Sequence, residues 1–309
     1  MHQTLASAIE TTPRRASTSD DVVDIFQFAI DASRDHRVAL ATLIEIRGGA
    51  ARPLGSHLAV SSDGRFCGYV SGGCVEAAVA TEALLALSEG VDRQVHFGLG
   101  SSYFDITLPC GGGITVAIHV LQDVGALKFV IDTLHGRGQA ALAYCPASQL
   151  LRPSEIAERS GTRGLEFVTV YRPRTRLLVS GAGGETEAVE QLGFNSKFDV
   201  IPCRVDGQSG VIGRIADAFT AIALLHHDLD AEIDILEFAL GSPAFYIGAL
   251  GSSRTHRRRT DRLTKLGYGS QTIERIKAPI GMFGPTRDST SLAISVLADI
   301  AAARLAAFP

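Results

Sequence analysis

The C-terminal part of the chain alternates short apolar runs with longer helical patterns, and this alternation restricts the fold more than any other feature. Strands are predicted at 177–180, 199–202, 221–225 and 245–248. Helices are predicted at 185–192, 230–240, 255–266 and 289–306. Strands that alternate with helices form a parallel sheet covered on both faces, and such sheets bind ligands at the carboxyl ends of their strands. We therefore expect a Rossmann-like, doubly wound parallel sheet here.

The N-terminal part mixes helical and strand patterns. Helices are expected from Ser19 or Asp20 onward and at 75–87. Strands are expected at 38–46, 57–60, 65–70, 94–97, 114–121, 140–144 and 166–171, with an exposed loop between the last two. The strand at 114–121 alternates apolar and polar residues, which places His119 on its solvent face. The fold class predicted for the whole chain is α/β, with a mixed α/β domain before the Rossmann-like one.

The length of 309 residues suggests two domains. Residues 1–19 are rich in Thr, Ser, Ala and Arg but lack the apolar core of a secretory signal, so they are expected to be a disordered leader. A linker at 171–176 divides the rest into domains at 20–172 and 173–309.

The composition argues against several classes of protein. A net charge of -4 gives no reason to expect nucleic acid or a membrane surface as a partner. No apolar run approaches the length of a transmembrane helix. The five cysteines are odd in number and scattered, unlike a disulfide framework. A cytoplasmic protein with free thiols is expected.

A cysteine preceded by two glycines stands at the predicted start of the 75–87 helix, in the stretch Ser71-Gly-Gly-Cys-Val-Glu76. The free N–H groups and the positive end of the helix dipole favour a thiolate at Cys74. Gly72 and Gly73 leave the backbone bare, so a flat or anionic ligand can approach it closely. The carboxylate of Glu76 is expected either to stay with the first N–H groups of the helix or to face the ligand.

The same chemistry recurs in Leu108-Pro-Cys-Gly-Gly-Gly113, beside a predicted strand. Either motif alone is better explained by a small buried cysteine and a tight turn. The two motifs together favour a ligand site to which Cys110, Gly111 and Gly112 contribute.

Two glycine loops follow predicted strands in the C-terminal part. Gly181-Ala-Gly-Gly-Glu-Thr186 is a poor dinucleotide fingerprint, because Thr186 replaces the third glycine and Glu185 brings a negative charge to the place of a pyrophosphate. Ala249-Leu-Gly-Ser-Ser-Arg-Thr255 is the better anion site, since it offers hydroxyls and an arginine at the start of a helix. A phosphate is therefore expected at the backbone of Gly251 and at Ser252, Ser253 and Arg254, whereas Arg257 and Arg259 are expected to be solvated.

His226-His-Asp228 ends a predicted strand and raises the question of a metal. Adjacent residues on a strand point to opposite faces, and no companion cluster accompanies them. Asp228 is better interpreted as a helix cap.

Five stretches together resemble the XdhC/CoxI family of accessory proteins for molybdenum hydroxylases. They are Pro53-Leu-Gly55, Ser71-Gly-Gly-Cys-Val-Glu76, Leu108-Pro-Cys-Gly-Gly112, Tyr246-Ile-Gly-Ala-Leu-Gly-Ser252 and Pro279-Ile-Gly281. The likeness covers 38–120 and 245–305 well and 176–240 in outline. The sequence departs from the family pattern at Pro202-Cys-Arg204 and at His226-His-Asp228, which argues against nucleotide recognition at the first glycine loop.

The resemblance implies an XdhC-type domain followed by a Rossmann-like domain. It also implies a chaperone, without turnover of its own, that binds molybdenum cofactor, assists its sulfuration and inserts it into an apo-molybdenum hydroxylase of the xanthine dehydrogenase or CO dehydrogenase type. A cysteine desulfurase as sulfur donor and a homodimer are the further partners that it implies. Cys74, Glu76 and Cys110 would carry the chemistry, with Cys74 and Cys110 as contacts to molybdenum. Ser71, Gly72, Gly73, Gly111 and Gly112 would bind the cofactor, together with the second glycine loop.

Two other classes of protein compete with the chaperone. An NAD(P)-dependent oxidoreductase would use the Rossmann-like domain, but the missing glycine at Thr186 and the missing ribose-binding acid count against it. A purely structural protein would leave both cysteine motifs unexplained.

Overall fold

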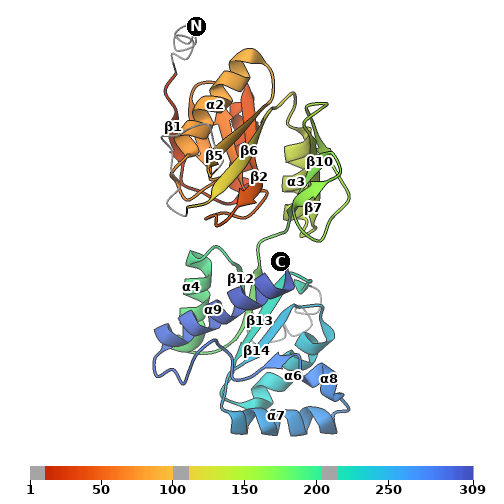
Figure 1. The fold of residues 1–309 in the computed structure, drawn as a ribbon. Helices are drawn as coiled ribbons and strands as arrows, with labels where there is room; N and C mark the ends of the chain where they lie inside the picture. Colours follow the sequence, from red (N-terminus) through yellow and green to blue (C-terminus); the bar gives the residue numbers. More distant parts are fainter. Residues whose placement is uncertain (1–10, 100–110, 204–214, 309) are drawn as a thin grey trace. The chain divides into compact units, whose positions relative to one another are not determined.

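The structure is a computed structural model that describes residues 11–99, 111–203 and 215–308. The chain forms two compact units, the N-terminal unit at residues 1–172 and the C-terminal unit at 173–309 (Figure 1).

Six strands form the main sheet of the N-terminal unit, in the order β1-β4-β3-β2-β6-β5. They are β1 (Arg14–Ser17), β2 (Val38–Arg47), β3 (His57–Ser61), β4 (Arg65–Gly68), β5 (Arg93–Gly98) and β6 (Gly113–Val120). β1 pairs in parallel with β4, and the other neighbours are antiparallel. A second, antiparallel sheet contains, in order, β8 (Leu150–Pro153), β7 (Ala140–Cys145), β10 (Glu166–Tyr171) and β9 (Gly161–Arg163).

Helices cover both faces of the main sheet. α2 (Glu76–Glu89) packs Val79 and Leu87 against one face, in a core that includes Val116 of β6. α1 (Val22–Ala32) and α3 (Gly125–His135) share a second core with residues from the other face, among them Leu40. The cap of α1 is Asp21, whose carboxylate accepts from the N–H of Val23 at 2.9 Å. The sequence predicted Ser19 or Asp20, so the helix begins slightly later than expected.

His119 is buried, contrary to the sequence-based expectation of a solvent-facing residue. Its side chain is 7% exposed, and its Nδ1 lies 2.7 Å from Oδ2 of Asp92. The hydroxyl of Tyr144, from the second sheet, donates to the same oxygen at 2.9 Å. The expectation was wrong because an alternating strand indicates one solvated face only when nothing packs on that face.

Two other expectations for this unit need correction. Residues 14–17, inside the segment expected to be a disordered leader, form β1, with Arg14 opposite Arg65. The polar stretch expected as a loop between β7 and β10 contains β8 and β9. β1, β8 and β9 are short strands at the edges of their sheets. Edge strands tolerate polar residues, so their sequences lack the apolar alternation by which strands are predicted.

Five parallel strands form the sheet of the C-terminal unit, in the order β12-β11-β13-β14-β15. They are β11 (Arg176–Gly181), β12 (Asp199–Cys203), β13 (Thr220–Leu225), β14 (Tyr246–Ala249) and β15 (Ile276–Lys277). α4 (Gly184–Asn195) and α9 (Ser289–Ala307) cover one face. α6 (Leu229–Gly241), α7 (Ser253–Lys265) and α8 (Ser270–Ile273) cover the other (Figure 1). The predicted α/β fold class, with its doubly wound parallel sheet, is confirmed.

Among the helices that the structure describes, α9 is long and apolar enough to cross a membrane by length and composition, which the sequence reasoning had overlooked. Leu292, Val296 and Ile300 of this helix lie in the core of the C-terminal unit. A helix that is apolar on several faces is typical of a protein core as well as of a membrane span. Of the apolar stretch of α9, 39% is buried in the unit.

Arg259 is likewise buried, whereas the sequence predicted a solvated side chain. It is 1% exposed and forms an ion pair with Glu232 of α6, which is equally buried. The four preceding positions of α7 are exposed or half-buried, so Arg259 is the arginine that faces the sheet.

Candidate functional site

Cys74 lies on the surface of the N-terminal unit, in the loop between β4 and α2. Val75 is the N-cap residue of α2, so the thiol stands one residue before the cap, beside the helix N-terminus. Cys74 is exposed, and its Sγ lies 3.4 Å from Oγ of Ser71. Gly73 has a φ of 108°, a left-handed conformation that glycine adopts without strain. The loop therefore presents a thiol and bare backbone to solvent.

The carboxylate of Glu76 holds this loop in place. Its side chain is only 1% exposed. Oε1 accepts from the backbone N–H groups of Val70 and Ser71 at 3.2 and 2.8 Å, and Oε2 accepts from that of Val75 at 3.3 Å. Both oxygens also lie 2.9 Å from Oγ of Ser71. Because hydrogen bonds to a charged acceptor are the stronger kind, Glu76 is a positioning residue for the loop that carries Cys74.

A third loop, Gly48–Arg52, lies against both cysteine motifs. A methyl group on Gly72 would lie 3.3 Å from Cβ of Ala51. Gly112 approaches the third loop so closely that a methyl group there would meet the carbonyl oxygen of Gly49 at 2.4 Å. Gly112 is thus required for chain packing. The third loop thus contacts described residues of both motifs. The sequence indicates a loop at Gly48–Gly55, but it gave no sign that this loop would contact the cysteine motifs.

Cys110 itself falls in segment 100–110, outside the described residues, but both flanks of that segment are held together. The N–H of Leu99 donates to the carbonyl of Gly112 at 3.0 Å. Arg47 donates from Nε to the carbonyl of Leu99 at 3.1 Å and from Nη2 to that of Ile114 at 3.3 Å. The described flanking residues Leu99 and Gly112 therefore lie together, and Gly112 also contacts the third loop at Gly49.

The described thiols differ in their surroundings. Cys67 and Cys203 are buried, and burial raises the pKa of Cys67 and raises the pKa of Cys203 to about 11. Cys145 is half-buried, and a hydrogen bond with the side chain of Ser148 lowers its pKa. Cys74 is the exposed member of the set. Cys145 is thus a rival for Cys74 in reactivity, which the sequence alone did not reveal.

We expect iodoacetamide near neutral pH to label Cys74 first, before Cys145 and Cys110, and at least about 10-fold faster than Cys67 and Cys203, because a buried thiol must wait for local opening. Peptide mass spectrometry over time measures each rate. Ser148→Ala serves as a control that slows Cys145 and leaves Cys74 unchanged. Equal rates at Cys74 and the buried thiols would contradict the expectation.

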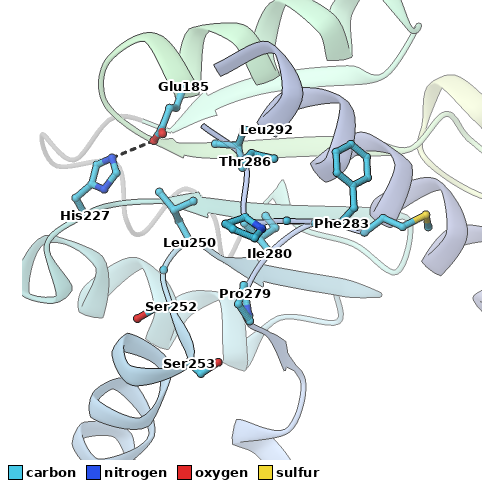
Figure 2. Close-up of a pocket in the computed structure, with 15 residues that line it drawn as sticks. Glu185, His227, Leu250, Ser252, Ser253, Pro279, Ile280, Phe283, Thr286 and Leu292 are labelled. Carbon is cyan, nitrogen blue, oxygen red and sulfur yellow. Dashed lines mark hydrogen bonds and ion pairs between the residues drawn. The ribbon is translucent and has the colours of Figure 1, made fainter. Parts of the chain in front are cut away.

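The C-terminal unit contains a cavity of about 670 Å³ where β13 and β14 end (Figure 2). Gly251, Ser252 and Ser253 of the predicted anion loop line it. Ser252 is the N-cap residue of α7, and its Oγ accepts from the N–H of Thr255 at 3.3 Å. Arg254, predicted for the same phosphate, is exposed and does not belong to the lining residues.

The opposite wall of the cavity is the loop 279–286, which two buried side chains of α9 hold in place. Oγ of Ser295 accepts from the N–H of Phe283 at 2.9 Å and donates to its carbonyl at 2.6 Å. The N–H of Met282 donates to the carbonyl of Ser295 at 3.0 Å, and that of Gly281 to Oδ2 of Asp299 at 3.3 Å. These contacts hold the wall in one conformation, and no local sequence pattern indicates them.

The first glycine loop and the His226–Asp228 segment meet at the same end of the sheet. His227 and Glu185 both line the cavity, and a dashed line joins them in Figure 2. Nε2 of His227 lies 2.9 Å from Oε2 of Glu185. His226 turns the other way, and its Nε2 lies 2.8 Å from Oγ of Ser180. Asp228 caps α6 by accepting from the N–H of Asp230 at 2.9 Å. Among the described residues, no group of three or more metal-ligating side chains is found. The hydrogen bond to Asp230 confirms that Asp228 is a helix cap.

Comparisons with known proteins agree with this division of the chain. Residues 32–98 match the model of the XdhC and CoxI family, and residues 177–300 match that of the XdhC Rossmann domain. The chain is 43% identical over 299 residues to the molybdenum cofactor insertion chaperone PaoD of Escherichia coli K12, covering 95% of this chain and 92% of PaoD. The chain belongs to the XdhC/CoxI family. The predicted resemblance is confirmed.

Two more distant similarities extend the comparison. The chain is 23% identical to a protein of Bacillus subtilis 168 described as a probable xanthine dehydrogenase component, over 84% of this chain and 91% of that protein. A crystal structure described as a xanthine dehydrogenase from Bacillus halodurans superposes with a TM-score of 0.71 at 20% identity, over 93% of this chain and 96% of that one. The second likeness concerns the fold alone.

Proposed function

We propose that this protein is a chaperone that binds molybdenum cofactor and inserts it into an apo-molybdenum hydroxylase. The observation that carries the proposal is the exposed Cys74 on a loop that the buried Glu76 positions, in a chain 43% identical to a molybdenum cofactor insertion chaperone. A thiolate is a soft ligand that suits a molybdenum centre or the transfer of sulfur. The cofactor is the cargo of this reaction, and the protein supplies the site that holds it.

The finer parts of the proposal follow from the same residues. Cys74, with Cys110, contacts the molybdenum or carries sulfur during sulfuration, with a cysteine desulfurase as the donor. Gly72, Gly73 and Gly111 offer backbone groups to the cargo, whereas the buried hydroxyl of Ser71 donates to Glu76 and keeps the loop in place. In the C-terminal unit, the N-terminus of α7, with Ser252 and Ser253, binds a phosphate. A xanthine dehydrogenase-type target, a homodimer and a cytoplasmic location complete the proposal.

The alternative, an NAD(P)-dependent oxidoreductase, has less support. Thr186 occupies the place of the third glycine, and a methyl group on Gly181 would lie 2.6 Å from its Oγ1. Glu185 places a carboxylate in the cavity where a pyrophosphate needs positive potential.

Replacing Cys74 with alanine is expected to lower retention of the cofactor by more than about 10-fold. Removing a residue that only hydrogen-bonds to a metal-contacting residue already lowers metal affinity by about 10–100-fold, and removing the contacting residue itself should cost more. Activation of a co-expressed partner hydroxylase is expected to be lost with it. Retention is measured from molybdenum content and pterin fluorescence of the purified protein. Cys145→Ser is the matched control and should behave as wild type. Full activation by Cys74→Ala, or tight NAD(P)H binding in place of the cofactor, would refute the proposed function.

A further inference from the structure

We infer that the cavity of the C-terminal unit recognises a ring with an amino-pyrimidinone edge, the edge that pterins and guanine share, and that its occupant is a pterin. This inference rests on the proposed function. It assigns a binding site for the pterin ring, which the proposed function does not locate. The cavity volume of about 670 Å³ lies within the range of roughly 300–1,000 Å³ that small-molecule sites occupy.

The walls of the cavity suit a planar ring. Leu250, Ile280 and Phe283 line it together (Figure 2). Phe283 and its neighbour Met282 are each 52% exposed, although the backbone that carries them is tied to Ser295 by three hydrogen bonds. Large apolar side chains that are rigid yet exposed at a cavity are typical of a binding surface, and an aromatic ring gains from stacking on another.

The polar group that selects the ring is Glu185. An amino-pyrimidinone presents two adjacent N–H donors, which match the two oxygens of a carboxylate. Oε2 of Glu185 is 2.9 Å from Nε2 of His227, so the histidine holds the carboxylate at the edge of the cavity. The charge that argues against a pyrophosphate at this loop thus favours a ligand rich in hydrogen-bond donors.

The test compares 6-hydroxymethylpterin with the corresponding lumazine, in which an oxygen replaces the 2-amino group. Ring fluorescence of each compound, titrated with the full-length protein, gives its affinity. We expect the wild type to bind the pterin about 10-fold or more tightly than the lumazine, because the lumazine leaves a charged acceptor unpaired. Glu185→Gln should reduce this discrimination to within about 3-fold. Phe283→Ala should weaken both compounds alike, by about 5-fold or more.

The matched control is Glu187→Gln, which removes the same charge from an exposed position in the first turn of α4, outside the residues that line the cavity. It should keep the wild-type discrimination. Equal affinity of the wild type for pterin and lumazine, or equal effects of the two glutamate variants, would overturn the inference. Tighter binding of guanosine monophosphate than of the pterin would overturn the choice of occupant. The titration uses metal-free rings and reads no hydroxylase activation, whereas the proposed function is tested by cofactor retention and activation with the Cys74 variant, so failure here and failure of the proposed function are distinguishable.

Discussion

Replacing Arg259 with methionine is expected to destabilise the C-terminal unit by about 3–5 kcal/mol, the cost of removing one partner of a buried ion pair. Nε and Nη2 of Arg259 donate to the two carboxylate oxygens of Glu232 at 2.5 and 2.8 Å, and both side chains are 1% exposed. Nη2 also donates to the carbonyl of Leu250 at 2.8 Å. Methionine replaces the volume of the side chain but leaves the carboxyl group of Glu232 without its partner in the core.

The experiment is a urea titration followed by a short hydrogen-exchange pulse and mass spectrometry of peptides from α6 and α7. Because exchange is read peptide by peptide, the unfolding of each unit is measured separately. A single optical signal from a chain without tryptophan would not distinguish the two units. The double variant Glu232→Met/Arg259→Met should recover most of the lost free energy of unfolding, since a well-packed apolar pair replaces a buried ionic one at little cost. Arg258→Met, at the exposed neighbouring position, should change it by less than about 0.5 kcal/mol. If Arg259→Met lowers the free energy of unfolding by less than about 1 kcal/mol, Arg259 and Glu232 do not form a stabilising buried ion pair.

Arg259 also shows why part of the fold was not predictable from the sequence. Periodicity places Arg254, Arg258 and Arg262 on one helix face, but it does not say which face a strongly basic helix turns inward. The answer depends on Glu232, a residue 27 positions earlier in the chain. The same limit applies to His119, whose burial depends on Tyr144 from another sheet. Long-range partners of polar residues leave no local pattern.

The elements themselves were predictable because apolar periodicity is a local property. The predicted strand at 177–180 is observed as Arg176–Gly181, and the predicted helix at 289–306 as Ser289–Ala307. Edge strands such as β1 were missed, since they bury little and carry no clear alternation.

For the candidate site, the sequence placed Cys74 before a helix but left the direction of Glu76 open. The structure shows its carboxylate accepting from the loop N–H groups, a geometry that depends on how the loop folds back over the helix start. The cavity was beyond sequence reasoning for a similar reason. Its lining residues Glu185, Ser252 and Phe283 come from the start of α4, the cap of α7 and the loop 279–286, and only the parallel sheet brings these three segments together.

Acidification from pH 6.5 to pH 5 is expected to remove about 2 kcal/mol of stability from the N-terminal unit through His57 alone. The ring is buried, and burial lowers the pKa of His57 from 6.5 to about 3. Nδ1 lies 3.0 Å from Oγ1 of Thr42, and Nε2 lies 2.8 Å from the hydroxyl of Tyr171. Between pH 6.5 and pH 3, His57 therefore binds a proton in the unfolded chain but not in the folded chain. The contribution of His57 is fully present above pH 6.5 and falls as the pH falls, and the loss amounts to about 4–5 kcal/mol by pH 3.

His57→Gln isolates this contribution from that of the carboxylates that also titrate in acid. Glutamine keeps a polar group near the hydroxyl of Tyr171 but takes up no proton. The variant should be less stable than the wild type at pH 7. Between pH 4 and pH 6, the slope of its unfolding free energy against pH should be smaller by about 1.4 kcal/mol per pH unit, which corresponds to about one proton fewer taken up on unfolding. The pulsed hydrogen-exchange titration, read on peptides from β2, β3 and β10, measures the slope. His135→Gln, at an exposed position in the last turn of α3, should leave the slope unchanged. If His57→Gln and the wild type keep parallel pH profiles, His57 is protonated in the folded protein and the buried neutral ring is refuted.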